Sequence, residues 1–163
     1  MIFITTGTQA PFNRLIKAMD EIAASLNGEE VIVQAAGVDF EVKNMTVTGF
    51  IKPDEFDKLY LRARLIVSHA GMGSIIQALT MNKDIIIVPR YASLGEHRND
   101  HQVATAKKME SMAKMPVAYD IADLKTKIDE VSSNEDKVTH IKVGPWASEQ
   151  LMAQCPRQVE VGR

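Results

Sequence analysis

Residues 67–79 read VSHAGMGSIIQAL and contain the clearest indication of the fold class in the sequence. A short apolar run passes through a Gly-x-Gly turn, Gly71 to Gly73, directly into a helical pattern. A buried strand that turns sharply into a helix is typical of parallel α/β sheets. The first turn of such a helix has unpaired N–H groups and a partial positive charge, which favour an anion such as a diphosphate. Gly-x-Gly can equally make a tight turn without a ligand, and the pattern alone leaves both interpretations open.

The rest of the chain repeats this alternation of short apolar runs and amphipathic helices. Apolar residues follow one another within each run, as is typical of parallel strands covered by helices on both faces. The predicted strands are residues 2–5, 31–34, 45–48, 65–68, 85–88 and 116–119. The predicted helices are residues 12–26, 53–63, 73–81, 98–113 and 121–131. The fold class is therefore a doubly wound, mostly parallel α/β sheet of the Rossmann type.

Composition predicts one globular domain over residues 1–131 and an extension over 132–163 that serves as a docking arm or a loose end. The chain has 163 residues, 45% of them hydrophobic, and a net charge of −2, so nucleic acid is disfavoured as a partner. Its single cysteine, Cys155, is expected to be a free thiol in the cytoplasm. No apolar run approaches the roughly 18 residues of a membrane helix. Met109, Met112 and Met115 are expected to fill the core or a subunit contact, with the core preferred.

Two further loops carry polar groups suited to a ligand. TTGTQ, residues 5–9, follows the first strand, and ligands bind beyond the carboxyl ends of parallel strands. RYASLGEHRNDHQ, residues 90–102, has the dense donors and acceptors that sugar hydroxyls require, although Asn99 and Asp100 can also cap a helix. Neither the 5–9 loop nor the Gly-x-Gly turn at 71–73 has a nucleoside-triphosphate or three-glycine dinucleotide motif, so kinase-like and nicotinamide-dependent enzymes are disfavoured. No metal-ligand spacing appears, and no metal or tightly bound cofactor is expected.

VSHAGMGSIIQAL, IIIVPR and GEHRNDHQ, together with the opening FITTGTQAPFNRLI, resemble the donor-binding C-terminal half of GT-B glycosyltransferases of family 28. The resemblance extends over about residues 1–120 and is greatest to small catalytic subunits of split UDP-N-acetylglucosamine transferases and their bacterial exopolysaccharide counterparts. It implies a UDP-sugar donor carrying N-acetylglucosamine, glucuronic acid or a similar sugar. It also implies inverting transfer to a lipid-linked saccharide in polysaccharide or glycolipid synthesis.

The resemblance also implies a partner and a location. A GT-B enzyme has two such domains, so a membrane-associated partner subunit is expected to bind the acceptor. The chain is then expected to be cytoplasmic and peripheral to the inner face of the membrane. When isolated, it is expected to self-associate through the face that the partner covers.

Carried over position by position, the resemblance implies that the diphosphate is bound by Thr6, Gly7, Thr8, Gly71, Met72, Gly73 and Ser74. It implies that the backbone of Phe50 and Ile51 receives the uracil ring, and that the donor sugar is held by Asp100, His101 and Gln102. At Gln77 the family usually has a glutamate that grips the ribose, and glutamine brings hydrogen bonds without the charge.

Three residues beside the expected cleft are candidates for the general base: His69, Glu96 and His97. His69 is also a candidate to bind the nucleotide or to satisfy a buried backbone group at the end of a strand. A non-catalytic module that binds a nucleotide sugar and regulates polysaccharide export is the alternative function, kept open by Gln77. A flavodoxin-like or response-regulator-like domain is disfavoured, because no acidic cluster follows the strands.

Overall fold

A computed structural model describes residues 1–133, which form a parallel sheet between layers of helices. The strands are β1 (Ile2–Thr5), β2 (Val31–Gln34), β3 (Thr46–Thr48), β4 (Leu65–His69) and β5 (Asp84–Val88). Their order is β3-β2-β1-β4-β5, and every neighbouring pair is parallel. This order confirms the predicted doubly wound class, and the connections reverse direction between β1 and β4.

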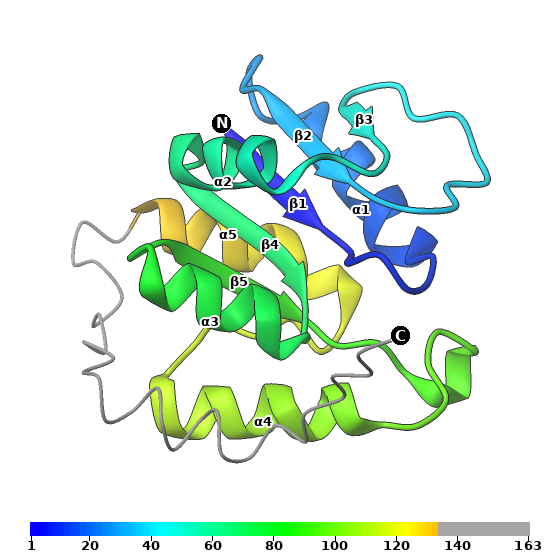
Figure 1. The fold of residues 1–163 in the computed structure, drawn as a ribbon, viewed down its shortest axis with the longest axis vertical. Helices are drawn as coiled ribbons and strands as arrows, with labels where there is room; N and C mark the ends of the chain where they lie inside the picture. The colour runs from blue at the N-terminus through cyan, green and yellow to red at the C-terminus, as the bar shows by residue number, and fades with distance from the viewer. Residues whose placement is uncertain (134–163) are drawn as a thin grey trace, which may run out of the picture.

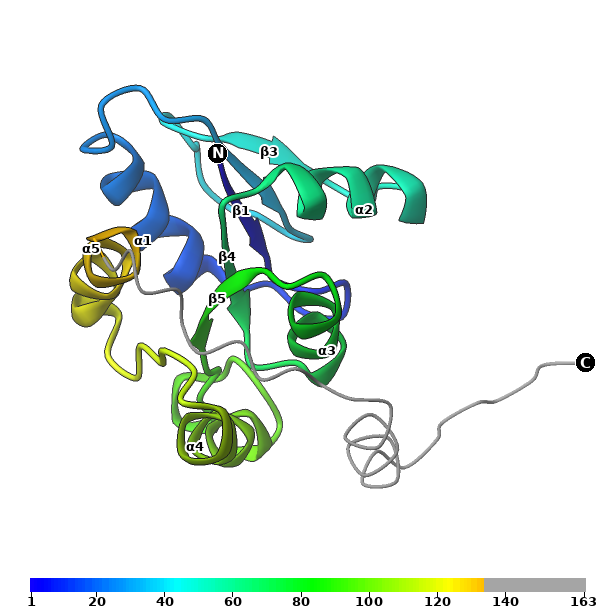
Figure 2. The ribbon, with the colours of Figure 1, turned by 90° about the vertical axis from the view of Figure 1, so that its left-hand side faces the viewer.

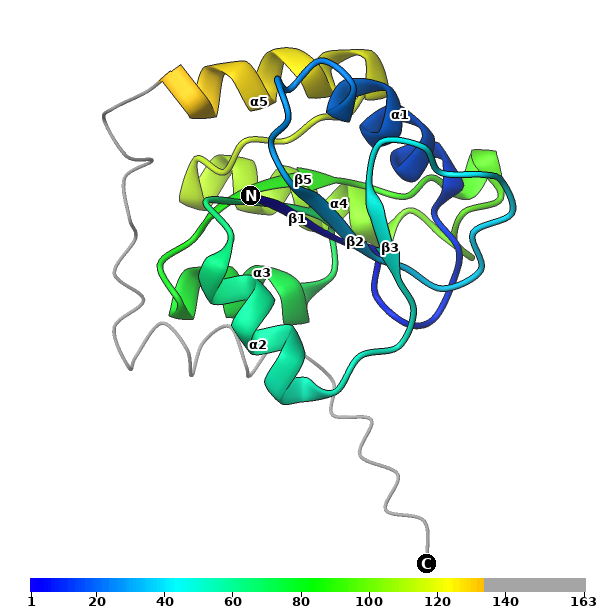
Figure 3. The same ribbon diagram turned by 90° about the horizontal axis from the view of Figure 1, so that it is seen from above.

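Helices cover both faces of this sheet. They are α1 (Asn13–Ala23), α2 (Pro53–Arg62), α3 (Met72–Thr80), α4 (His101–Ala113) and α5 (Leu124–Ser133), with 3₁₀ turns η1 (Ala92–Leu94) and η2 (Ile121–Asp123). Figure 1 shows these elements in a view onto the sheet, and the turned view of Figure 2 shows α1 and α5 on one side of the strands and α2 and α3 on the other. The view from above shows the same layers (Figure 3).

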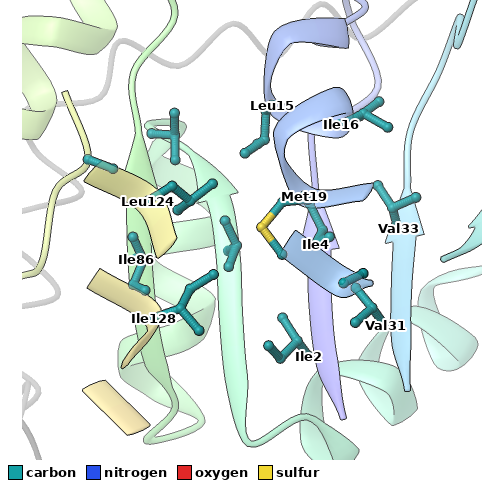
Figure 4. Close-up of a cluster of buried hydrophobic side chains, with 14 of the residues drawn as sticks. Ile2, Ile4, Leu15, Ile16, Met19, Val31, Val33, Ile86, Leu124 and Ile128 are labelled. Carbon is teal, nitrogen blue, oxygen red and sulfur yellow. The ribbon is translucent and has the colours of Figure 1, made fainter. Parts of the chain in front are cut away.

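Two apolar clusters, one on each face, hold the sheet between these helices. Figure 4 shows the first cluster, in which Ile4 of β1 lies near Met19 of α1. Phe3 enters the second cluster, with Tyr60 of α2 and Met109 of α4. Successive residues of a strand point to opposite faces, so a strand buried on both must be apolar throughout. This is the physical origin of the consecutive apolar runs.

Two expectations about the elements are wrong. Residues 116–119 do not form a strand: Val117 makes an isolated parallel bridge with Ile87, supported by hydrogen bonds from the Ile87 N–H to the Pro116 carbonyl and from the Ala118 N–H to the Ile87 carbonyl. Pro116 has no N–H to extend that ladder. Met112 was expected in the core but is 64% exposed on α4, whereas Met109 and Met115 are buried.

Helix α5 crosses the predicted domain boundary and is described as far as Ser133. The remainder of the predicted extension, with Cys155, lies outside the described residues. Over residues 1–133, no helix combines the length and apolar character needed to cross a membrane.

Candidate functional site

A cleft of about 920 Å³ opens beyond the carboxyl ends of β1, β4 and β5. We call it the switch-point cleft, because it lies where the strand order reverses, the usual ligand site of such sheets. Its lining residues are Thr6, Gly7, Thr8, Gln9, Ala10, His69, Gly71, Gly73, Ser74, Arg90, Glu96, His97, Arg98 and Gln102. The structure therefore brings the three predicted loops together.

The first turn of α3 forms one wall of the cleft. Gly71 is its N-cap, so no side chain caps the helix, and Gly73 and Ser74 line the cleft. The fully buried Tyr60 donates a hydrogen bond of 2.8 Å from its hydroxyl to the Ser74 carbonyl. Burial raises the pKa of Tyr60, so the hydroxyl remains a donor and fixes this turn in place. The positive end of the helix dipole faces the cleft as a result.

The two glycines of the turn have different surroundings. A Cβ atom on Gly71 would lie 2.2 Å from Nε2 of His69, and one on Gly7 would lie 3.0 Å from Cε1 of the same ring. The imidazole thus fills the space between Gly7 and Gly71. A Cβ on Gly73 would meet nothing within 4 Å. Gly71 accommodates His69, and Gly73 is the glycine with open space beside it.

His69 is a neutral imidazole at pH 7. Burial and the nearby charge of Arg90 lower the pKa of His69 to about 4. Its Nδ1 lies 3.4 Å from the Thr5 carbonyl oxygen, which can only accept, so Nδ1 carries the proton in this contact. The lone pair of Nε2 is then available to accept a proton or a hydrogen bond.

Arg90 forms part of the floor of the cleft and was not predicted as a site residue. Its side chain donates to the carbonyls of Thr6 at 2.8 Å and Ala10 at 2.6 Å, and it lies 4.9 Å from the ring centroid of Phe12. Arg90 is 3% exposed and its Nε has no partner, and neither has the buried hydroxyl of Thr6. Unsatisfied buried groups cost about 1–3 kcal/mol each. An arginine directly after a buried strand and a proline was the signal available in the sequence.

The donor-sugar positions implied by the resemblance separate in the structure. Gln102 is buried, lines the cleft and accepts a 3.1 Å hydrogen bond from the Arg90 N–H. Asp100 and His101 are exposed and do not line the cleft. Asp100 accepts a 2.9 Å hydrogen bond from the Ala92 N–H instead, and the Asn99 side chain accepts one from the His101 N–H. Asp100 is the N-cap of α4 and makes no side-chain cap hydrogen bond, so of the two capping candidates only Asn99 accepts from a backbone N–H at the start of this helix.

The other two base candidates differ in availability. Both Glu96 oxygens accept hydrogen bonds from Arg14, at 2.7 and 3.0 Å, and one also accepts from the Tyr91 N–H at 3.0 Å. His97 lines the cleft, with Nδ1 3.1 Å from the Asn99 carbonyl oxygen. Because a carbonyl can only accept, Nδ1 holds the proton there and Nε2 is free.

The implied nucleoside positions lie outside the lining of the cleft. Phe50 is 84% exposed after β3, and Ile51 packs against the second apolar cluster. Met72, which the resemblance assigned to the diphosphate, packs against the same cluster and does not line the cleft. Gln77 donates a 2.7 Å hydrogen bond to the Asp57 carboxylate of α2. These residues lie within α3 and within the connection between β3 and α2. Among the described residues, no three His, Cys, Asp or Glu side chains gather as a metal site requires.

Comparison with known proteins identifies the family to which the chain is similar. Residues 1–144 match the model of the glycosyltransferase family 28 C-terminal domain. Over 111 residues the chain is 32% identical to the UDP-N-acetylglucosamine--N-acetylmuramyl-(pentapeptide) pyrophosphoryl-undecaprenol N-acetylglucosamine transferase of Bacteroides fragilis. Over 121 residues it is 25% identical to the UDP-N-acetylglucosamine transferase subunit ALG13 of Yarrowia lipolytica.

The matched parts of these relatives are limited. The first match covers 63% of this chain and 28% of the Bacteroides enzyme, and the second covers 67% of this chain and 60% of the Yarrowia subunit. The solution structure of ALG13 has the same fold: it superposes with a TM-score of 0.62 at 17% identity, over 94% of this chain and 95% of that chain.

Proposed function

The chain belongs to the glycosyltransferase family 28 C-terminal domain family, and from this premise we propose that it is the donor-binding, catalytic subunit of a UDP-sugar-dependent glycosyltransferase. One observation carries the proposal: the uncapped N-terminus of α3 and the unpartnered hydroxyl of Thr6 belong to the same cleft. Both are suited to an anion, and the diphosphate of a nucleotide sugar supplies one.

The diphosphate would lie against the first turn of α3. N–H groups at Gly73 and Ser74 and the hydroxyl of Thr6 would donate to its oxygens, and the charge of Arg90 would favour it from below. These groups are held before any ligand arrives, by Tyr60 under α3 and by the bonds of Arg90 to the Thr6–Ala10 loop. Fixed donors stabilise the charge that develops as UDP departs.

In the proposed reaction, an oxygen of the acceptor hydroxyl forms a bond to the anomeric carbon. The bond from that carbon to the diphosphate oxygen breaks, and UDP leaves with the electron pair, with inversion at carbon. The hydroxyl proton passes to a base. We assign this role to Nε2 of His97 if this chain supplies the base, because Nε2 is free and the residue lines the cleft. His69 is retained as the second candidate.

Acceptor binding is assigned to a partner. The Yarrowia relative is named a transferase subunit, which supports a two-component enzyme here. We propose a membrane-associated partner that binds a lipid-linked saccharide and holds this chain at the cytoplasmic face. The donor sugar is N-acetylglucosamine, glucuronic acid or a similar sugar, and the sugar end of the cleft would include Gln102. Without the partner, self-association is expected and is measured by sedimentation.

Calorimetric titration tests donor binding. Wild-type chain is titrated with UDP, UDP-N-acetylglucosamine, UDP-glucuronic acid, GDP and ADP, and so are Gly73→Trp and Met112→Trp. An indole at Gly73 would fill the open space of the cleft, whereas at Met112 it would stay on an exposed surface. Uridine-selective binding that is lost in Gly73→Trp and kept in Met112→Trp supports the proposal. Equal binding of ADP, or unchanged binding by Gly73→Trp, contradicts it.

A non-catalytic nucleotide-sugar-binding module is the second candidate, favoured by the amide of Gln77 and its bond to Asp57. Release of UDP in native membranes that contain the partner separates the two. A transferase releases UDP only when the acceptor is present, and His97→Gln abolishes the release. A binding module retains donor affinity and never releases UDP.

A further inference from the structure

Arg14, in the first turn of α1, joins two segments that are far apart in the sequence. Its Nε lies 2.7 Å from Oε1 of Glu96, and one terminal nitrogen lies 3.0 Å from Oε2. The same nitrogen donates to the Pro89 carbonyl at 3.0 Å. The Arg14 side chain is 21% exposed and that of Glu96 is 12% exposed. A forked, largely desolvated pair of this kind is far more directional than an exposed ion pair.

Two aromatic rings lie near the same guanidinium. The Arg14 guanidinium lies 5.3 Å from the ring centroid of Phe12 and 5.4 Å from that of Tyr91. The Arg90 guanidinium lies 4.9 Å from the Phe12 ring. Rings and guanidinium groups therefore alternate from the 90–102 loop to the floor of the cleft, in the order Tyr91, Arg14, Phe12 and Arg90.

The fork is placed where it affects the cleft. Glu96 directly precedes His97 and Arg98, and all three line the cleft. Glu96 also accepts from the Tyr91 N–H, which closes the 91–96 turn on its own carboxylate. Arg14 lies four residues after the Thr6–Ala10 loop, which also lines the cleft. The Arg14–Glu96 pair thus links the start of α1, which follows this loop, to the 96–98 segment of the cleft lining.

We infer that Arg14 is a positioning residue of the donor site, which clasps Glu96 and so holds His97 and Arg98 over the sugar end of the cleft. The inference rests on the proposed function. It gives Glu96 a structural part in the clasp, because three hydrogen bonds already occupy its carboxylate, in place of the role of general base. The diphosphate end is held by the Tyr60–Ser74 hydrogen bond and by those of Arg90 to the Thr6 and Ala10 carbonyls, in which neither Arg14 nor Glu96 takes part.

The test compares Arg14→Lys, Glu96→Gln and the double variant with the wild-type chain. Arg14→Lys keeps the charge and removes the fork. Arg64→Lys is the matched control, since Arg64 makes an equally forked pair with Glu29, at 2.6 Å for both contacts, beside the amino end of β4. Affinities for UDP, UDP-N-acetylglucosamine and UDP-glucuronic acid are measured by calorimetry. Hydrogen exchange of the 91–98 amides is measured without ligand.

Of the two UDP-sugars, the one that the wild-type chain binds more tightly is the reference ligand. We expect each single variant to bind this ligand about tenfold more weakly than wild type, and to bind UDP with an affinity within about twofold of wild type. The double variant should bind the UDP-sugar no more weakly than either single variant, because the two substitutions remove the same interaction. Exchange at 91–98 should accelerate in these variants and not in Arg64→Lys. Equal losses for UDP and UDP-sugar, additive losses, or unchanged exchange would overturn the inference while leaving the proposed function standing. Failure of the wild-type chain to bind any uridine nucleotide would overturn both.

Discussion

Replacement of Gly71 by alanine should displace the imidazole of His69, lower the free energy of unfolding and weaken UDP binding in the switch-point cleft. The added Cβ would lie 2.2 Å from Nε2, 2.8 Å from Cδ2 and 3.0 Å from Cε1 of the imidazole. Ordinary contacts between such atoms are about 3.5–4.0 Å, so the ring has to move by more than about 1 Å. It has no room on its other side, where Gly7 lies against the same ring.

The cost follows from this confinement. Gly71 has φ −86° and ψ 131°, which alanine adopts freely, so backbone strain contributes nothing. What remains is overpacking, which costs about 1–3 kcal/mol in a well-packed site. Gly73→Ala provides the matched comparison, because its Cβ meets nothing within 4 Å and alanine favours a helix by up to about 1 kcal/mol. The two alanines should therefore shift stability in opposite directions.

Urea unfolding of Gly71→Ala, Gly73→Ala, His69→Ala and the Gly71→Ala/His69→Ala pair measures these effects. In the His69→Ala background the ring is gone, so Gly71→Ala should cost less than about 0.5 kcal/mol. Titration with UDP should show weaker binding by Gly71→Ala, since the displaced ring either enters the cleft or shifts the α3 start. If Gly71→Ala destabilises equally with and without the imidazole, the packing argument is refuted.

Three other predictions concern the core and the site. Met109→Ala should lower the free energy of unfolding by about 2–5 kcal/mol and Met112→Ala by less than about 0.5 kcal/mol in urea, since only the first is buried. His69 has a pKa of about 4 when folded and 6.5 when unfolded, so unfolded chain binds more protons between these values. The free energy of unfolding should therefore rise by about 3 kcal/mol from pH 4 to 6.5, and this increase should be complete above pH 6.5. His69→Gln should lack this increase when its unfolding is compared with that of wild type. Tyr60→Phe should cost about 1 kcal/mol by thermal unfolding, because the Ser74 carbonyl loses its donor; no change would contradict a fixed α3 start.

The fold could be predicted because each buried strand needs apolar residues on both faces. Residues 2–5 and 85–88 carry this requirement directly, and the structure contains them as β1 and most of β5. Residues 116–119 satisfy the same composition and still make one bridge, since a strand also needs a continuous row of donors, which Pro116 interrupts. Composition therefore predicts that a segment is buried, whereas the length of its hydrogen-bonded pairing depends on where the chain turns away from the neighbouring strand.

The site was predictable where it depends on strand ends and not where it depends on distant pairs. Loops after parallel strands must share one edge of the sheet, which brings Thr6, Gly73 and Gln102 together. Asp100 and His101 lie outside the lining of the cleft because α4 begins at His101, and this helical phase turns Gln102 inward. Arg14 gave no local signal, because its partner Glu96 is 82 residues away.

The strand order also determines how long one edge of β1 remains unpaired during synthesis. β1 can pair with β2 as soon as residues 31–34 leave the ribosome, but its other edge pairs with Leu65 to Ser68. At about 5–20 residues per second, that edge stays open for roughly 2–7 s after β2 appears. An open apolar edge is a template for association with other chains. Nascent chains paused between the two strands should therefore recruit chaperones, and a faster passage through residues 35–65 should raise the soluble yield.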